Sequence, residues 1–573
     1  MGQPLSGSHS GSYRDKRNLE AKGNTVTAQP APSGTAEKTT AEVDVVVVGA
    51  GFAGLYALHR LRGQGLSVRV FEAAAGVGGV WYWNRYPGAR CDVESVDYSY
   101  SFDPDLEQEW DWTEKYATQP EILAYLNHVA DRFDLRRDIS FETRVTDMVL
   151  DEKTLRWQVR TDRGDAVSAR FCILAVGPLS NANIPDIEGL DSFAGQVYHT
   201  AHWPHEGVDF TGKRVGVIGT GSSGIQAIPC IAREAAQLYV FQRTPNYSVP
   251  AGNVPLDDET RAAQKAGYAE RRRLSMLSGG GSPHQPHPKS ALEVSAEELQ
   301  QTYERRWELG GVLFSKAFPD QLVTIEANDT ARRFWEQKVR DVIDDPAVAD
   351  VLIPKDHPIG AKRICTDDNY FQTFNRDNVT LVNLRATPIE RIDASGLDTT
   401  EAHYDLDALV LATGFDAMTG SVQKLNVVGR AGRTLNEAWA AGPITYLGLG
   451  VPGFPNLFNI AGPGAPSVLA NMVLHSELHL NWVADAIAHL DAQGAPAIEA
   501  RADAAAEWVD ECTRRAAETL MPQANSWYLG ANIPGKPRVF MPFVGGFGVY
   551  GEIIADVAAA GYKGFDIHQD LTA

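Results

Sequence analysis

The sequence predicts an α/β protein with two Rossmann-like dinucleotide-binding domains and a helical insertion in the second domain. Two glycine-rich turns carry this prediction, at residues 49–54 and 219–224. Each follows an apolar run typical of a buried parallel strand and precedes a segment with helical spacing. The length of 573 residues agrees, because it suffices for two to four domains.

The composition indicates a globular protein with an acidic surface. Apolar residues make up 44% of the chain, and the formal net charge is -21. We therefore expect neither nucleic acid nor an anionic membrane surface as a partner. We also expect no transmembrane helix and no secretory signal, because the chain lacks apolar runs of the required length.

The five cysteines are scattered and odd in number, which predicts a cytoplasmic protein without a disulfide framework. We expect no metal site. His284 and His287 lie in a tract rich in glycine and proline, without an array of cysteines or carboxylates beside them.

The predicted organisation begins with a disordered tail at residues 1–40, where small and polar residues offer too little apolar surface for folding. Residues 41–170 are expected to form the first part of one dinucleotide-binding domain, and residues 389–573 its second part. Residues 171–388 are expected to form the other domain, with the helical insertion at about residues 250–345.

The first domain opens with a strand at residues 43–48, the glycine turn, and a helix that runs to Arg62. A second strand at residues 67–71 ends at Glu72. The turn lets the backbone approach a pyrophosphate at the helix N-terminus, and the acid can accept a hydrogen bond from a ribose hydroxyl. The predicted contacts are Gly49, Gly51, Phe52, Ala53, Gly54 and Glu72. The alternative is a glycine-rich turn that binds no ligand.

Between the two glycine turns, residues 119–133 have helical spacing and residues 141–159 alternate as strands do. Residues 171–177 are typical of a short apolar strand that closes on a glycine.

The second domain repeats the pattern with a strand at residues 213–218, a helix at 225–234 and a strand at 237–242. This last strand ends at Arg243, so a cation stands where the first domain has an acid. An arginine there can pair with a 2′-phosphate, which predicts NADP over NAD; the alternative is an ordinary surface arginine. The predicted contacts are Gly219, Thr220, Gly221, Ser222, Ser223, Gly224 and Arg243.

The C-terminal part contains an apolar stretch at residues 408–416, a strand ending in an Ala-Thr-Gly turn, that we expect to close the first domain. Helices are predicted at residues 468–490 and 501–520.

Two further motifs resemble the signatures of type I Baeyer–Villiger monooxygenases. The first is GVWYWNRYPGARCD at residues 79–92, and the second is FAGQVYHTAHWP at residues 193–204. The resemblance runs from about residue 40 to the end and is closest to the phenylacetone and steroid monooxygenase branch. The ending Trp203-Pro204 separates this family from flavin monooxygenases that oxidise nitrogen or sulfur.

The resemblance implies FAD in the first domain, NADPH in the second, and conversion of a ketone to an ester or lactone with O2. It implies that Arg363 stabilises a flavin C4a-peroxide and the anionic adduct formed with the ketone, and that Asp92 positions Arg363. Cyclic, polycyclic terpenoid or steroid, and aryl ketones are the candidate substrates, and a monomer is implied. The alternatives are a flavin monooxygenase that oxidises nitrogen or sulfur, and a non-catalytic flavoprotein that responds to NADPH.

Further site residues are implied by the matching motif positions. The additional flavin contacts are Gly79, Val80, Trp81, Arg90, Asp92, Tyr98, Val145 and Met472. The additional NADP contacts are Gln226, Thr244, Lys362, Arg363 and Trp527. The segment Pro466, Ser467, Val468 and Leu469 resembles one that lines the substrate pocket. His199 is interpreted as a hinge residue between the domains or, alternatively, as a buried structural histidine.

Overall fold

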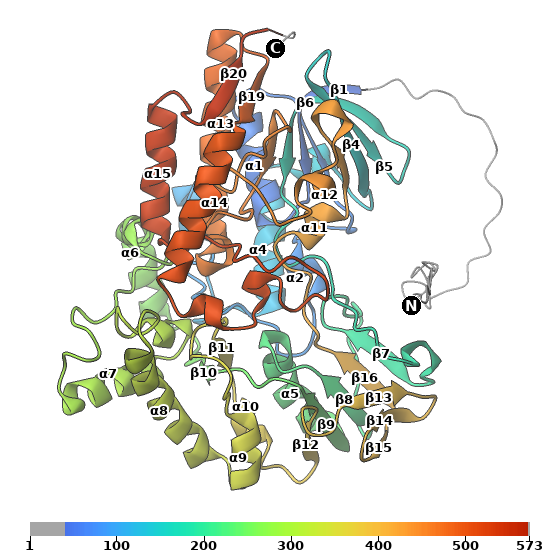
Figure 1. The fold of residues 1–573 in the computed structure, drawn as a ribbon, viewed down its shortest axis with the longest axis vertical. Helices are drawn as coiled ribbons and strands as arrows, with labels where there is room; N and C mark the ends of the chain where they lie inside the picture. The colour runs from blue at the N-terminus through green and yellow to red at the C-terminus, as the bar shows by residue number, and fades with distance from the viewer. Residues whose placement is uncertain (1–40, 571–573) are drawn as a thin grey trace, which may run out of the picture.

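Two β-sheets form the framework of the molecule in the computed structural model, which describes residues 41–570 (Figure 1). The first sheet has eight strands, with the neighbours β17, β4, β5, β6, β1, β2 and β3 in that order, and β18 paired with β6. The second has five strands in the order β12, β9, β8, β16, β7, all parallel. This architecture confirms the predicted α/β class with two Rossmann-like domains. The tail predicted at residues 1–40 lies outside the described residues.

The strands of the first sheet come from both ends of the chain. They are β1 (Ala41–Val48), β2 (Val68–Phe71), β3 (Ile139–Ser140), β4 (Val145–Asp151), β5 (Arg156–Thr161), β6 (Ala166–Leu174), β17 (Asn426–Val428) and β18 (Leu457–Asn459). The second sheet consists of β7 (Gln196–His199), β8 (Arg214–Ile218), β9 (Gln237–Gln242), β12 (Val379–Asn383) and β16 (Ala408–Leu411). Smaller sheets pair β10 (Ser248–Pro250) with β11 (Cys365–Asp367), β14 (Gly396–Thr399) with β13 (Ile389–Ile392) and β15 (His403–Asp405), and β19 (Ala497–Ala500) with β20 (Phe565–His568).

The α-helices fall into three groups. Those of the N-terminal part are α1 (Phe52–Arg62), α2 (Val80–Trp83), α3 (Pro104–Glu109) and α4 (Gln119–Arg132). Those of the second domain and its insertion are α5 (Ser222–Glu234), α6 (Asp258–Leu277), α7 (Ala296–Leu309), α8 (Ile325–Val342), α9 (Pro346–Leu352) and α10 (Tyr370–Thr373). The C-terminal ones are α11 (Gly420–Gln423), α12 (Leu435–Ala438), α13 (Met472–Gln493), α14 (Ala502–Ala517) and α15 (Phe547–Ala559). Within residues 41–570, no helix combines the length and apolar character needed to span a bilayer.

The first domain is built around β1, which lies between β6 and β2. Its central valines are fully buried, as a strand covered on both faces requires. Helix α1 packs so closely on the preceding turn that a Cβ atom on Gly54 would lie 1.8 Å from the Gly49 carbonyl oxygen. This contact explains why the turn needs a glycine at that position.

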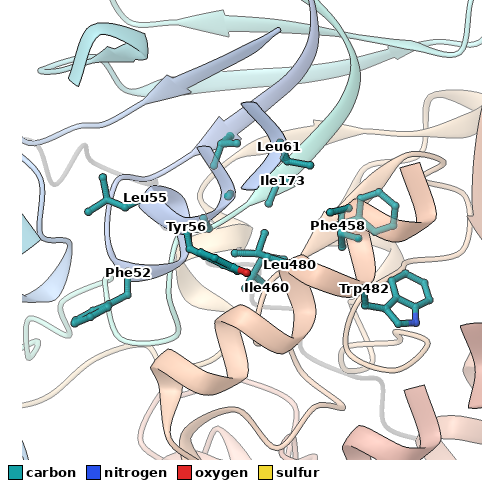
Figure 2. Packing of buried hydrophobic residues seen from close by; sticks show 14 of the residues in the cluster. Phe52, Leu55, Tyr56, Leu61, Ile173, Phe458, Ile460, Leu480 and Trp482 are labelled. Atoms are coloured by element: carbon teal, nitrogen blue, oxygen red, sulfur yellow. The ribbon is translucent and has the colours of Figure 1, made fainter. Parts of the chain in front are cut away.

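Helix α13 covers α1 although the two helices are far apart in the sequence. Figure 2 shows Leu55, Tyr56 and Leu61 of α1 in one packed cluster with Leu480 and Trp482 of α13. All five side chains are buried. The C-terminal part of the chain therefore completes the core that its N-terminal part begins.

The helical insertion lies beside the second sheet, and its helices α7, α8 and α9 gather at one side of the molecule (Figure 1). Trp335 of α8 anchors it. The indole is fully buried, donates a hydrogen bond from Nε1 to the Ser248 carbonyl oxygen at 2.6 Å, and packs edge-on against Tyr247 at 4.7 Å. The predicted insertion is thus present, and its last helix ends at Leu352, beyond the predicted boundary.

Both expected boundaries between the domains are wrong. Strand β6 continues to Leu174 and pairs with β1 and β5, so the first part of the first domain extends past residue 170. Strand β16 was expected in the first domain, but it pairs in parallel with β8 and β7 of the second sheet. The small sheet β13–β15 also contributes Ile392, Leu397 and Tyr404 to a core cluster with Phe241 of β9. Strand pairing over long distances in the sequence decides these boundaries, and local patterns do not report it.

Candidate active site

The first glycine turn forms an open helix N-terminus. No side chain caps α1 at Gly51, so the first-turn amides are available to an anionic ligand. Glu72 closes the site from β2: its Oε2 accepts from the Ala50 amide at 2.6 Å and its Oε1 from the Ala74 amide at 2.7 Å. Burial raises the pKa of this carboxyl. A Cβ atom on Gly51 would lie 3.5 Å from Gly79 Cα, so the predicted Gly79 contact borders the same turn.

Aromatic side chains wall the space in front of this turn. Trp81 donates from Nε1 to the Tyr98 hydroxyl at 3.2 Å, and the Tyr98 ring packs edge-on against Phe52 at 5.1 Å. Val145 is buried at the start of β4, in a core cluster with Val48 at the end of β1. The predicted flavin contacts Gly79, Trp81, Tyr98 and Val145 thus lie around the carboxyl end of β1.

The second glycine turn has the same form and a clear opening. A Cβ atom on Gly219 or Gly224 would lie 2.4 Å or 2.2 Å from a backbone oxygen, so these two glycines are enclosed. A Cβ atom on Gly221 would meet nothing within 4 Å, and no side chain caps α5 there. A ligand phosphate can therefore approach the backbone at Gly221, as in other dinucleotide sites.

Cations gather at the carboxyl ends of β9 and β12. Arg243 is exposed after β9, and the Thr220 hydroxyl of the glycine turn donates to the Thr244 carbonyl oxygen at 3.1 Å. Lys362 lies in the same group, close enough to Arg385 and Arg243 for their charges to affect it. Burial lowers the pKa of Lys362 most, the two arginines lower it further, and Asp356 opposes the shift. The predicted Arg243, Thr244 and Lys362 are therefore brought together.

Arg385 is a member of this group that the sequence analysis missed. It follows β12, donates to the Thr244 hydroxyl at 3.4 Å and forms an ion pair with Asp356. Although burial opposes it, hydrogen bonds from His357 and Arg385 lower the pKa of Asp356 to about 2. The sequence signal for Arg385 is the apolar run at residues 379–383, which is typical of a strand. If this strand lies parallel to β9, the residues that follow both strands meet at the same edge of the sheet.

Arg363 and Asp92 form a two-point ion pair. The guanidinium donates from Nε and Nη2 to the two carboxylate oxygens at 3.0 and 2.8 Å, and from Nη1 to the Val468 carbonyl oxygen at 2.8 Å. Burial disfavours the charge of Arg363, but Asp92 overcomes this and raises the pKa of the guanidinium. The cation is therefore fixed and fully charged between the 79–92 motif and the predicted substrate segment.

Gln226 joins the 79–92 motif to the second domain. The Tyr86 hydroxyl donates to Gln226 Oε1 at 2.8 Å, and Gln226 Nε2 donates to the Arg90 carbonyl oxygen at 3.1 Å. The Arg90 side chain forms ion pairs with Glu114 at 2.9 Å and Asp368 at 3.6 Å. Since Gln226 lies on α5, this motif touches both domains.

The predicted substrate segment lies against the C-terminal part of the chain. Val468, Leu469 and Met472 belong to an apolar cluster with Trp527 and Tyr528, and Pro466 and Ser467 are buried next to it. Tyr528 was not predicted from the sequence. Burial raises its pKa to about 12, and the neighbouring Arg363 opposes this shift. The structure thus brings Trp527, the substrate segment and Arg363 together.

His199 lies where the chain passes between the two domains. Its Nδ1 accepts from the Ala201 amide at 3.0 Å, so Nε2 carries the proton and faces the Thr413 hydroxyl at 3.3 Å and the Asn183 carbonyl oxygen at 3.4 Å. Burial lowers the pKa of His199 to about 4. Asn183 lies in the segment that enters the second domain, and Thr413 in the segment that leaves it. The neutral His199 therefore contacts both connections between the domains.

Two glycine turns at the ends of parallel strands, one facing an acid and the other facing cations, define a protein with two dinucleotide sites. Residues 42–250 match the model of the family described as "Flavin-binding monooxygenase-like". The curated "Baeyer-Villiger monooxygenase" of Pseudooceanicola batsensis is 43% identical over 93% of this chain and 97% of its own. A second relative, "Phenazine N-monooxygenase PhzNO1" of Lysobacter antibioticus, is 41% identical over 92% of this chain and 97% of its own.

Among solved structures, that of "Oxidized steroid monooxygenase bound to NADP" is 73% identical, with a TM-score of 0.89, and the match covers 92% of this chain and 100% of that one. The chain belongs to the flavin-binding monooxygenase-like family and, within it, to the Baeyer–Villiger monooxygenases. This confirms the resemblance that the two motifs indicate.

Proposed function

We propose that this protein is an FAD-, NADPH- and O2-dependent monooxygenase that converts a ketone to an ester or lactone. The observation that carries the proposal is the fixed cation of Arg363, held by Asp92 on one side and by the Val468 carbonyl oxygen on the other. A site that only binds nucleotides needs no such cation between the cofactor motif and the apolar cluster around Val468.

The residues of both glycine turns fit the two cofactors. The uncapped start of α1 and the buried Glu72 suit the pyrophosphate and ribose of FAD. The opening at Gly221 and the cations Arg243, Lys362 and Arg385 suit NADPH with its 2′-phosphate. When bound, FAD supplies the redox chemistry that activates O2 with electrons from NADPH.

Arg363 would act by electrostatic stabilisation of negative charge that develops at the reacting carbonyl oxygen. At a distance of about 4 Å and an effective dielectric constant of ~20, one such charge contributes roughly 4 kcal/mol. The negative charge of Asp92 offsets part of this, and in exchange it fixes the orientation of the guanidinium. The buried apolar side chains around Val468 would exclude water from the same place.

The test is the variant Arg363→Ala, assayed for two steps. We expect NADPH to reduce the flavin still, while ester or lactone is no longer formed. Arg391→Ala, which removes an exposed arginine paired with Asp398 on the small sheet, is the control and should keep both steps. Unchanged product formation by Arg363→Ala would refute the assignment.

Oxidation of a heteroaromatic nitrogen is the second candidate function, favoured by the similarity to the phenazine N-monooxygenase. The two candidates differ in product: a ketone gives an ester, and a phenazine gives an N-oxide. Competition of a cyclic ketone with phenazine-1-carboxylic acid, followed by mass spectrometry, separates them.

The family resemblance implies a monomer. We also expect the protein to act in the cytoplasm, as its five scattered cysteines indicate. We expect His199 to work as the hinge, because it contacts both segments that connect the domains. The residues around Val468 are expected to set the size of the accepted ketone.

A further inference from the structure

The side chain of Lys316 is a cation in the active-site region without a counter-ion. Lys316 ends the 3-10 helix η3 (Val312–Lys316) in the helical insertion. Its neighbours Phe314 and Ala317 are fully buried, whereas Lys316 is exposed. The lysine side chain therefore points away from the packed side of η3, toward open space.

That open space borders the substrate segment. The Lys316 ammonium nitrogen lies 3.0 Å from where a Cβ atom of Gly280 would be, and this same position lies 3.9 Å from the Leu469 carbonyl oxygen. The Gly280 carbonyl oxygen accepts from the Asn471 amide at 3.0 Å, so the glycine loop is fastened directly behind the substrate segment. Arg363 is close enough to lower the pKa of Lys316, together with the larger effect of desolvation.

Several other lysines of this chain that lie against the protein have acidic partners. Lys338 pairs with Glu304 at 2.8 Å, and Lys536 pairs with Asp416 at 2.5 Å. Arg363 has Asp92. Within residues 41–570, no carboxylate lies within ion-pair distance of the Lys316 ammonium. A lysine near a second cation and without a counter-ion of its own is stabilised when an anion binds beside it.

We propose that Lys316 binds an anionic group, a carboxylate, carried by the ketone substrate at some distance from its carbonyl. This inference rests on the proposed function and adds the substrate class: keto acids in preference to neutral ketones. A local cation such as Lys316 would offset the repulsion that a formal net charge of -21 exerts on an anionic substrate. Arg363 would face the carbonyl, and Lys316 would hold the other end of the molecule.

The test compares two ligands of nearly equal shape, 3-oxocyclohexanecarboxylic acid and its methyl ester. Dissociation constants are measured by calorimetry on the FAD-containing protein with NADP+ present. In the wild type we expect the acid to bind more tightly than the ester. In Lys316→Met, which keeps the length and removes the charge, the ratio of the two constants should fall about tenfold or more, as for loss of a charged hydrogen bond. Lys316→Arg should keep most of the preference.

The control is Lys153→Met, in the exposed hairpin between β4 and β5, which should leave the ratio unchanged. An unchanged ratio in Lys316→Met overturns the inference. A weaker affinity for NADP+ in Lys316→Met, with an unchanged ratio, also overturns it and assigns the lysine to the cofactor.

The rate of ester oxygenation, measured in parallel, tests the proposed function separately. If the binding preference depends on Lys316 but neither ligand is oxygenated, the anion site stands and the proposed reaction fails. If the ester is oxygenated but no preference exists, the reaction stands and the anion site fails.

Discussion

Arg363 holds Asp92 through two hydrogen bonds and the Val468 carbonyl oxygen through a third, at 2.8 to 3.0 Å. Asp92 belongs to the motif at the first dinucleotide site, and Val468 to the substrate segment. One side chain therefore joins the predicted cofactor motif to the predicted substrate segment.

Removing the negative charge of Asp92 should weaken this arrangement without emptying the space. We expect Asp92→Asn to lower the rate of product formation about tenfold to a hundredfold, because charged hydrogen bonds contribute about 1.5–3 kcal/mol. Rapid mixing with NADPH, followed by product analysis, should show a smaller loss in flavin reduction than in oxygenation. Asp368→Asn, which removes the more distant of the two ion-pair partners of Arg90, at 3.6 Å, serves as the matched control. Equal losses in both variants would contradict the role given to Asp92.

Arg385 should contribute to the choice of NADP over NAD. We expect Arg385→Ala to raise the dissociation constant for NADP+ about tenfold and that for NAD+ far less, because only the former carries a 2′-phosphate. Arg243→Ala should act in the same direction. Titration of both cofactors measures the ratio. A similar loss of affinity for both would show that Arg385 supports the fold near Asp356 and does not discriminate.

Two glycines of the second turn should respond to alanine in opposite ways. Gly221→Ala should unfold at the wild-type temperature, since its Cβ atom meets nothing within 4 Å, but it should bind NADP+ more weakly. Gly224→Ala should lose stability, because its Cβ atom would lie 2.2 Å from the Gly219 carbonyl oxygen. Thermal unfolding without NADP+ and titration with NADP+ separate the effects. Full affinity in Gly221→Ala would mean that the phosphate does not approach there.

The pH dependence of stability should carry the signature of His199. Its pKa is about 4 in the folded protein, against an ordinary value of 6.5. Between these pH values His199 is protonated in the unfolded chain and neutral in the folded protein. This histidine therefore lowers the free energy of unfolding as the pH falls from 6.5 to 4. Above 6.5 it has no such effect.

Comparison with His199→Gln isolates this contribution. Urea unfolding at pH 7, 5.5 and 4.5 should show a smaller pH slope in the variant, by up to about 1.4 kcal/mol per pH unit for one proton. Glu477, whose pKa burial raises to about 7, acts in the opposite direction but is present in both proteins. Identical slopes would show that His199 is not held neutral.

Local patterns predict the strands, helices and glycine turns of this chain well, because each is specified by residues close in sequence. The strand predicted at residues 237–242 coincides with β9, and the helix predicted up to Arg62 coincides with the end of α1. What local patterns miss is pairing between distant segments. The sequence of β16 would suit the last strand of either domain. Only its pairing with β8 and β7 shows that it belongs to the second sheet.

The same limit applies to the site. The resemblance to a family supplied Arg363 and Asp92, and the structure adds that they touch. Arg385, Tyr528 and Lys316 carry no motif of their own. Their positions in the fold identify them. Arg385 lies at the edge of a sheet, Tyr528 in an apolar cluster, and Lys316 beside the substrate segment without a counter-ion in the described part of the chain.

The order of strands in the first sheet has a consequence for synthesis of the protein. Strands β1 to β6 leave the ribosome early, but β17 and β18, which pair with β4 and β6, follow only after the whole second domain. Until then the nascent sheet has unpaired backbone groups along β4 and part of β6, and exposed strands of this kind invite aggregation. The intervening domain has a complete parallel sheet of its own and can fold first. Variants that slow its folding should therefore reduce the yield of protein more than their effect on final stability suggests.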